Sequence, residues 1–114
     1  TLIYTSANNG SPIGAMLSQS NLISAVTNFA ESSGINENDM YYSTLSQANI
    51  YDRVVTLACM YVGASVGVLN IGSDVPKLLE EMVVRKPTVF RSVPKIYNDI
   101  YSAAKQTVSE LGGM

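Results

Sequence analysis

The side chains best suited to binding a ligand follow the first apolar run of the chain. This loop combines hydroxyl groups, amides and glycines, which are supplied by Thr5, Ser6, Asn8, Asn9, Gly10 and Gly14. Backbone N–H groups in a glycine-containing loop, together with neutral side-chain donors, form a cradle for phosphate. A Walker loop requires a lysine and a hydroxyl residue after its last glycine, and Ala15 and Met16 follow Gly14 here. The pattern therefore excludes a Walker loop and leaves a phosphate cradle of another kind as one interpretation.

Elements on either side must position this loop. The run Leu2-Ile3-Tyr4 predicts a buried strand before it. Apolar residues at helical spacing predict a helix over Ala15 to Ser32, or a helix that begins only at Ser20 after a short strand over residues 14–19. A strand, a polar loop and a helix N-terminus hold anions in open α/β folds, because loop and helix N–H groups converge on one point.

The same loop has a simpler interpretation. Asn-Gly is a frequent tip of a β-hairpin, because both residues tolerate a positive φ. Asn9-Gly10 then forms only a turn between two strands. The loop by itself is compatible with both the turn and the phosphate cradle.

The rest of the chain alternates between strand and helix patterns. Strands are predicted over Met40 to Leu45, Ser65 to Leu69 and Thr88 to Val93, and helices over Arg53 to Val62, Asp74 to Lys86 and Lys95 to Leu111. Asp74 is a helix cap in this prediction, and Pro87 ends the helix that follows it. Alternation of this kind predicts an α/β fold, built from right-handed βαβ units with a mostly parallel sheet flanked by helices.

An uncharged stretch of twenty residues, Val54 to Ser73, is long enough to cross a membrane. Glycines and an asparagine interrupt it at Gly63, Gly67, Asn70 and Gly72. We therefore expect a helix and a strand here, with no transmembrane span.

Composition excludes several classes of function. The 114 residues are 46% hydrophobic and 14% charged, and the net charge of −2 argues against nucleic-acid binding through a basic face. With no histidine and one cysteine, the chain has no disulfide framework, no Cys/His zinc site and no Ser-His-Asp triad of its own. We predict no metal site within it, and we expect Cys59 to be a buried small hydrophobe.

The first loop resembles the phosphate loop of the adenylate-forming enzymes, Tyr-Thr-Ser-Gly-Thr-Thr-Gly-x-Pro-Lys-Gly. Six residues match this pattern: Tyr4, Thr5, Ser6, Gly10, Pro12 and Gly14. Four differ, namely Ala7, Asn8, Asn9 and Ile13, and Ile13 stands in place of the lysine.

A second segment, residues 45–53, resembles Leu-Pro-Leu-Ala-His-Ile-x-Glu-Arg of the long-chain fatty acyl-CoA synthetases. Asp52 replaces the glutamate, and Asn49 replaces a histidine that in the family lies near the acyl carboxylate and the ATP phosphates. An asparagine does not titrate near neutral pH. Residues 74–79 and 86–98 also resemble family segments, so the likeness covers nearly the whole chain.

This resemblance implies that residues 1–114 form a single partial domain, the phosphate-loop subdomain of an AMP-binding N-terminal domain, and include no second domain. It places the β- and γ-phosphates of ATP at Thr5, Ser6, Asn8, Asn9, Gly10 and Gly14, and a catalytic position at Asn49. ATP, magnesium, a fatty acid and coenzyme A are the implied ligands of a longer parent protein. We expect none to bind tightly to this chain alone, which we also expect to self-associate.

The implied reaction joins a fatty acid to ATP as an acyl-adenylate, releases pyrophosphate and transfers the acyl group to coenzyme A. The alternative is a non-catalytic binding or scaffold relative, which has kept the fold but lost the loop lysine and the acyl-site histidine. The chain enters a strand directly at Thr1, so we expect it to be a piece of a longer protein. We expect that protein to be cytoplasmic or peripheral on an intracellular membrane.

Overall fold

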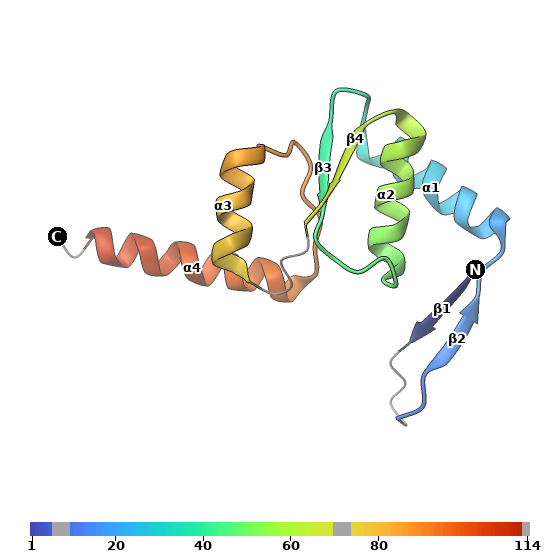
Figure 1. Ribbon diagram of the computed structural model, residues 1–114, viewed down its shortest axis with the longest axis horizontal. Coiled ribbons are helices and arrows are strands. Elements are labelled where there is room, and N and C mark those ends of the chain that lie inside the picture. Colours follow the sequence, from blue (N-terminus) through green and yellow to red (C-terminus); the bar gives the residue numbers. More distant parts are fainter. Residues whose placement is uncertain (6–9, 70–73, 113–114) are drawn as a thin grey trace.

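The computed structural model describes residues 1–5, 10–69 and 74–112. A small α/β body carries a β-hairpin on one side and a long helix on another (Figure 1). The elements run in the order β1 (Leu2–Thr5), β2 (Ile13–Met16), α1 (Gln19–Ser33), β3 (Met40–Ser43), α2 (Ile50–Val62), β4 (Ser65–Val68), α3 (Val75–Arg85) and α4 (Pro94–Gly112). The predicted α/β alternation is confirmed, with shorter strands than expected.

The sheet of the body is parallel, as predicted. Strands β3 and β4 pair in parallel, with Tyr41 opposite Val66. Of the strand predicted over Thr88 to Val93, only a single parallel bridge between Val89 and Tyr41 forms, so this prediction was wrong. Beyond Val89 the backbone groups bond elsewhere, because the Tyr97 hydroxyl accepts from the Ser92 N–H at 3.2 Å and donates to the Phe90 carbonyl oxygen at 3.4 Å.

Helices α1 and α2 lie on one face of the sheet, and α3 lies on the other (Figure 1). Tyr41 projects toward α2, where it packs with Ile35, Val55 and Cys59 in the core. Cys59 is fully buried, as predicted. Side chains alternate along a strand, so the neighbouring Tyr42 projects to the α3 face, where the Arg85 guanidinium lies 5.6 Å from the centre of its ring.

Local signals in the sequence set the helix ends. Ser18 and Asn21 form a reciprocal capping box, so α1 begins at Gln19. The later of the two predicted helix starts is therefore close to the observed one, and the start at Ala15 was wrong, because Ala15 lies in β2. Asp74 caps α3 as predicted, and that helix ends at Arg85, just before Pro87.

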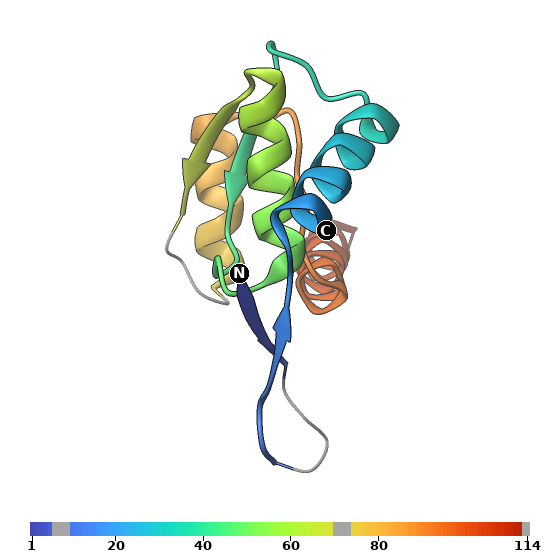
Figure 2. The same cartoon turned by 90° about the vertical axis from the view of Figure 1, so that its right-hand side faces the viewer.

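The first strand is not part of the central sheet. β1 pairs antiparallel with β2, and the resulting hairpin projects from the body (Figure 2). Ile3 is buried, but Leu2 and Tyr4 are 55% and 66% exposed, so the prediction of a buried strand was wrong. The apolar run indicates a strand, but its hydrogen-bonding partner is β2, which leaves most of its side chains without a second layer to pack on.

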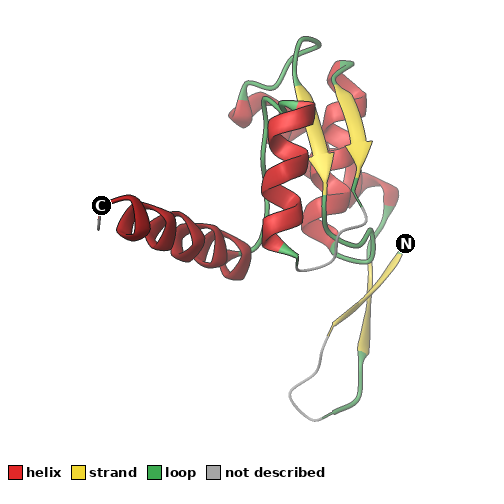
Figure 3. Ribbon diagram, turned by 60° about the vertical axis from the view of Figure 1, so that its left-hand side comes forward, coloured by secondary structure: helices red, strands yellow, loops and turns green. Residues whose placement is uncertain are grey.

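The uncharged stretch from Val54 to Ser73 divides between α2 and β4, as predicted, with Gly63 as the cap in left-handed conformation. The break predicted at Asn70 and Gly72 lies outside the described residues. Among the helices that the structure describes, none has the length and hydrophobicity of a membrane span. The longest, α4, extends away from the body, and Ile96 is its buried residue (Figure 3).

Candidate functional site at the carboxyl edge of the sheet

A pocket of about 550 Å³ lies where β3 and β4 end. It is lined by Ser43, Thr44, Leu45, Ser46, Gln47, Val68 and Leu69. The carboxyl edge of a parallel sheet is the usual binding edge in open α/β folds. The hairpin lies on the same side of the body, below the ends of the two strands in Figure 1. The pocket and the hairpin together form the candidate site.

Asn49 follows the pocket-lining segment and caps α2. Its side-chain oxygen accepts hydrogen bonds from the N–H groups of Tyr51, at 2.9 Å, and Asp52, at 3.4 Å. The residue is half-buried. Its amide oxygen is therefore engaged with the first turn of the helix, which is a structural role at the position where the sequence predicts a catalytic one.

Asp52 lies in the first turn of α2 and is fully buried. One of its carboxylate oxygens, Oδ1, accepts a hydrogen bond from the hydroxyl group of Tyr41. The other, Oδ2, accepts from the Ser43 hydroxyl at 2.5 Å and from the Gln47 amide at 2.6 Å. Three donors thus satisfy a carboxylate that forms no salt bridge within the described parts of the chain. These hydrogen bonds connect β3 and the loop of residues 44–49, called the pocket loop below, to α2.

In the sequence, Asp52 is only a conservative replacement for a glutamate, and Ser43 and Gln47 have no predicted role. A signal for part of the network was present. Tyr41 and Ser43 are two residues apart in a strand, so both face the same side, which is the side that α2 covers. An acidic residue near the start of a mostly apolar helix is the natural acceptor for two buried hydroxyl groups.

The predicted phosphate-binding residues that the structure describes lie on the hairpin. The Thr5 hydroxyl donates to the carbonyl oxygen of Ile13 at 3.3 Å, and Gly14 pairs with Tyr4. Gly10 has a φ of +83°, and among the described residues no atom lies within 4 Å of where a Cβ atom would stand. Ser6, Asn8 and Asn9 lie outside the described residues.

The predicted junction of phosphate loop and helix N-terminus does not form. β2 separates Gly10 from α1, and the N-terminus of α1 is capped by its own Ser18 and Asn21. β1 and β2 pair antiparallel, as the hairpin interpretation predicts, and the φ of Gly10 is positive; Asn9, the other residue of the predicted tip, lies outside the described residues.

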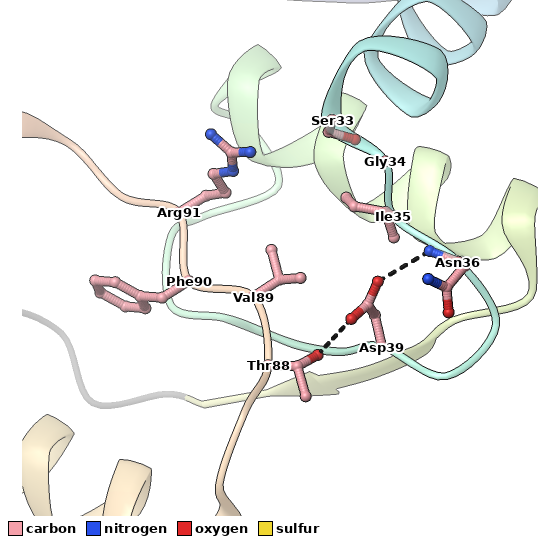
Figure 4. Close-up of a pocket in the computed structure, with 9 residues that line it drawn as sticks. All are labelled: Ser33, Gly34, Ile35, Asn36, Asp39, Thr88, Val89, Phe90 and Arg91. Atoms are coloured by element: carbon pink, nitrogen blue, oxygen red, sulfur yellow. Dashed lines mark hydrogen bonds between the residues drawn. The ribbon is translucent and has the colours of Figure 1, made fainter.

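A second pocket, of about 460 Å³, opens at the opposite edge of the sheet (Figure 4). Asp39 lies beside it and accepts hydrogen bonds from the Asn36 N–H and the Thr88 hydroxyl, both at 2.9 Å. The bond from Asn36 closes the turn before β3, and the bond from Thr88 connects this turn to the segment after α3. This pocket lies at the amino edge, whereas Asn49 directly follows the segment that lines the carboxyl-edge pocket, so we place the candidate site at the carboxyl edge.

Raising the pH above about 9 is expected to lower the free energy of unfolding. Burial raises the pKa of the Cys59 thiol, and burial with the hydrogen bond to Asp52 raises the pKa of the Tyr41 phenol. The folded chain therefore keeps protons that the unfolded chain releases, and each such proton contributes a slope of about 1.4 kcal/mol per pH unit. Urea unfolding at stepped pH measures this slope. Tyr41→Phe should flatten it above about pH 10, and an unchanged slope would contradict the assignment to Tyr41.

Comparison with known proteins identifies the family. The family model described as AMP-binding enzyme matches residues 1–113. The chain is 38% identical over 114 residues to long chain acyl-CoA synthetase 6, peroxisomal, of Arabidopsis thaliana, which covers 100% of this chain and 16% of that protein. It is 32% identical over 110 residues to fatty acyl-CoA synthetase B of Dictyostelium discoideum, covering 96% of this chain and 16% of that protein. The chain thus spans about a sixth of the length of these curated relatives.

Solved structures agree with this match. ATP-bound MatB from Rhodopseudomonas palustris superposes with a TM-score of 0.75 at 25% identity, covering 87% of this chain and 19% of that one. The fold is also shared with o-succinylbenzoate CoA synthetase from Bacillus subtilis, at a TM-score of 0.76 and 21% identity, covering 89% of this chain and 26% of that one. With a family model that matches nearly every residue, and with long-chain acyl-CoA synthetases as relatives along its whole length, this chain belongs to the family of AMP-binding enzymes.

Proposed function

We propose that residues 1–114 are part of an ATP-dependent long-chain fatty acid CoA ligase and form the phosphate-loop subdomain of its N-terminal domain. The observation that carries this proposal is the 38% identity, along the entire chain, to a long chain acyl-CoA synthetase. A pocket at the carboxyl edge of the sheet, with the hairpin on the same side, supports it.

The ligands of the full-length protein are a fatty acid, ATP with magnesium, and coenzyme A. The hairpin fits a phosphate group in one respect, because the backbone at Gly10 has the positive φ of anion-binding loops. Thr5 and Gly14 flank the loop on the paired strands and would position it against the phosphates. Magnesium would supply charge neutralisation at those phosphates when bound.

A non-catalytic relative is the second candidate, and two observations favour it. Ile13 brings no charge to the hairpin, where the family has a lysine that acts on phosphate. The side-chain oxygen of Asn49 is engaged in capping α2. On this alternative the protein keeps the fold and the pocket and binds a ligand without activating it.

The deciding experiment measures ATP-dependent release of pyrophosphate by the full-length protein with a long-chain fatty acid and coenzyme A. Pyrophosphate release and acyl-CoA formation in equal amounts are expected for the ligase. Release that needs no fatty acid would contradict the proposed substrate. Binding of ATP or fatty acid without turnover would favour the non-catalytic relative. Residues 1–114 alone serve as the matched control and are expected to be inactive.

A further inference from the structure

We propose that Asp52 is a positioning residue that sets the shape of the carboxyl-edge pocket through Gln47 and Ser43. Its two carboxylate oxygens accept hydrogen bonds from different parts of the protein. Oδ1 accepts from Tyr41, which belongs to the core. Oδ2 accepts from Ser43 and Gln47, and both of these residues line the pocket. One carboxylate therefore connects the packed interior to the wall of the candidate site.

The loop after β3 has few other restraints. Within it, the Asn49 N–H donates to the Ser46 carbonyl at 2.9 Å, and the Ala48 N–H donates to the Ser46 hydroxyl at 3.2 Å. These are local bonds, and they do not join the loop to the core. The Gln47 side-chain amide does: it donates to Asp52 at 2.6 Å, and it reaches the hydroxyl groups of Ser43 and Thr56 only at 3.5 Å, so Asp52 is its strongest acceptor. Gln47 is itself exposed, so without a buried acceptor its long side chain would sample several rotamers.

Burial makes Asp52 suited to this task. It is 0% exposed, as is Tyr41, and Ser43 is 1% exposed, so water does not compete for these hydrogen bonds. Hydrogen bonds to a charged acceptor are stronger and more directional than neutral ones. The carboxylate lies on α2, a rigid element that also carries the core residues Val55 and Cys59. Asp52 thereby fixes the position of the pocket loop relative to the core.

The proposal assigns the acyl substrate to this pocket, and only that part rests on the proposed function. In the full-length protein, Gln47→Met removes the donor while keeping the length of the side chain, and Asp52→Ala removes the acceptor. Each is expected to raise the KM for the fatty acid about tenfold, the value of one hydrogen bond to a charged group. The KM for ATP should stay within about twofold, well under the change expected for one lost hydrogen bond. The double variant should be no worse than either single variant, because both act through one contact.

Tyr41→Phe is the matched control. It removes a hydrogen bond from the same carboxylate, on the oxygen that faces the core, and should lower the melting temperature while leaving both KM values unchanged. If Asp52→Ala leaves the KM for the fatty acid at the wild-type value while Gln47→Met raises it, Gln47 acts without Asp52 and the positioning role is overturned. If Tyr41→Phe raises the KM for the fatty acid as much as Asp52→Ala does, the network contributes only to general stability and the positioning role is overturned.

Hydrogen exchange separates this inference from the ligase proposal, because it needs no activity. The Ala48 and Asn49 amides should exchange about tenfold faster in Gln47→Met than in wild type. The comparison uses the Ala64 amide as the reference, since it donates to the Cys59 carbonyl at 2.8 Å, away from the loop. Tyr41→Phe should leave the ratio unchanged. An unchanged ratio in Gln47→Met would overturn the positioning role even in an active ligase, and a changed ratio in an inactive protein would support it.

Discussion

Replacing Ile13 with lysine in the full-length protein is expected to raise kcat/KM for pyrophosphate release by about two to three orders of magnitude, the usual value of one preorganised donor to developing charge. Ile13 begins β2, pairs with Thr5 and is 60% exposed, so a lysine side chain fits there without burying its ammonium group. That group would reach the loop as a mobile positive charge for the phosphates. Steady-state release of pyrophosphate, with and without a fatty acid, measures the gain.

Ile13→Met is the matched control, because methionine adds a long, unbranched side chain without charge. It should leave the rate unchanged. A similar gain in both variants would assign the effect to the shape of the hairpin, and no gain in Ile13→Lys would mean that the neutral donors of the loop suffice or that activity was lost elsewhere.

Asn49→His is best added second, because it removes the cap of α2 at a cost of about 1 kcal/mol. Activity that appears only in the double variant would identify a catalytically retired relative.

Asp52→Ala is expected to lower the free energy of unfolding of residues 1–114 by about 3 kcal/mol, from two buried donors left unsatisfied at about 1–3 kcal/mol each. Tyr41 and Ser43 are both buried, and the second acceptor of the Ser43 hydroxyl, the Leu45 carbonyl oxygen, lies 3.4 Å away and makes a weak hydrogen bond. Gln47 is exposed and recovers its hydrogen bonds from solvent. Urea denaturation, followed by circular dichroism, measures the change in midpoint at constant slope.

One further single variant and one double variant show how much each donor contributes to this loss of unfolding free energy. Ser43→Ala removes one donor and leaves Asp52 with two, so its expected cost is about 1 kcal/mol. The Tyr41→Phe and Asp52→Ala variants share a contact, so combining them should cost less than the sum of the two. A cost of Asp52→Ala below about 1 kcal/mol would show that the buried network is replaced by repacking or by water.

Much of the local structure follows from the sequence. Asp74 and Pro87 bracket α3 because a side-chain cap and a missing N–H act on their immediate neighbours. Gly63 divides the uncharged stretch between α2 and β4, since glycine tolerates the left-handed conformation that ends a helix. Cys59 is buried, as its apolar neighbours predict. Family membership also follows from motifs that retain their order and spacing.

The tertiary structure decided which strands pair and which polar groups meet. Leu2 to Tyr4 and Thr88 to Val93 both have strand composition, yet the first pairs with β2 in a hairpin and the second contributes one bridge at Val89. Asn49 became a helix cap, and Asp52 became the acceptor for Tyr41, Ser43 and Gln47. Caps and helix ends depend on residues a few positions apart, so the sequence determines them. A strand's partner and a buried carboxylate's donors lie in other elements of the fold, so neighbouring residues do not determine them. Tyr41 and Ser43 reach Asp52 because α2 packs against the sheet.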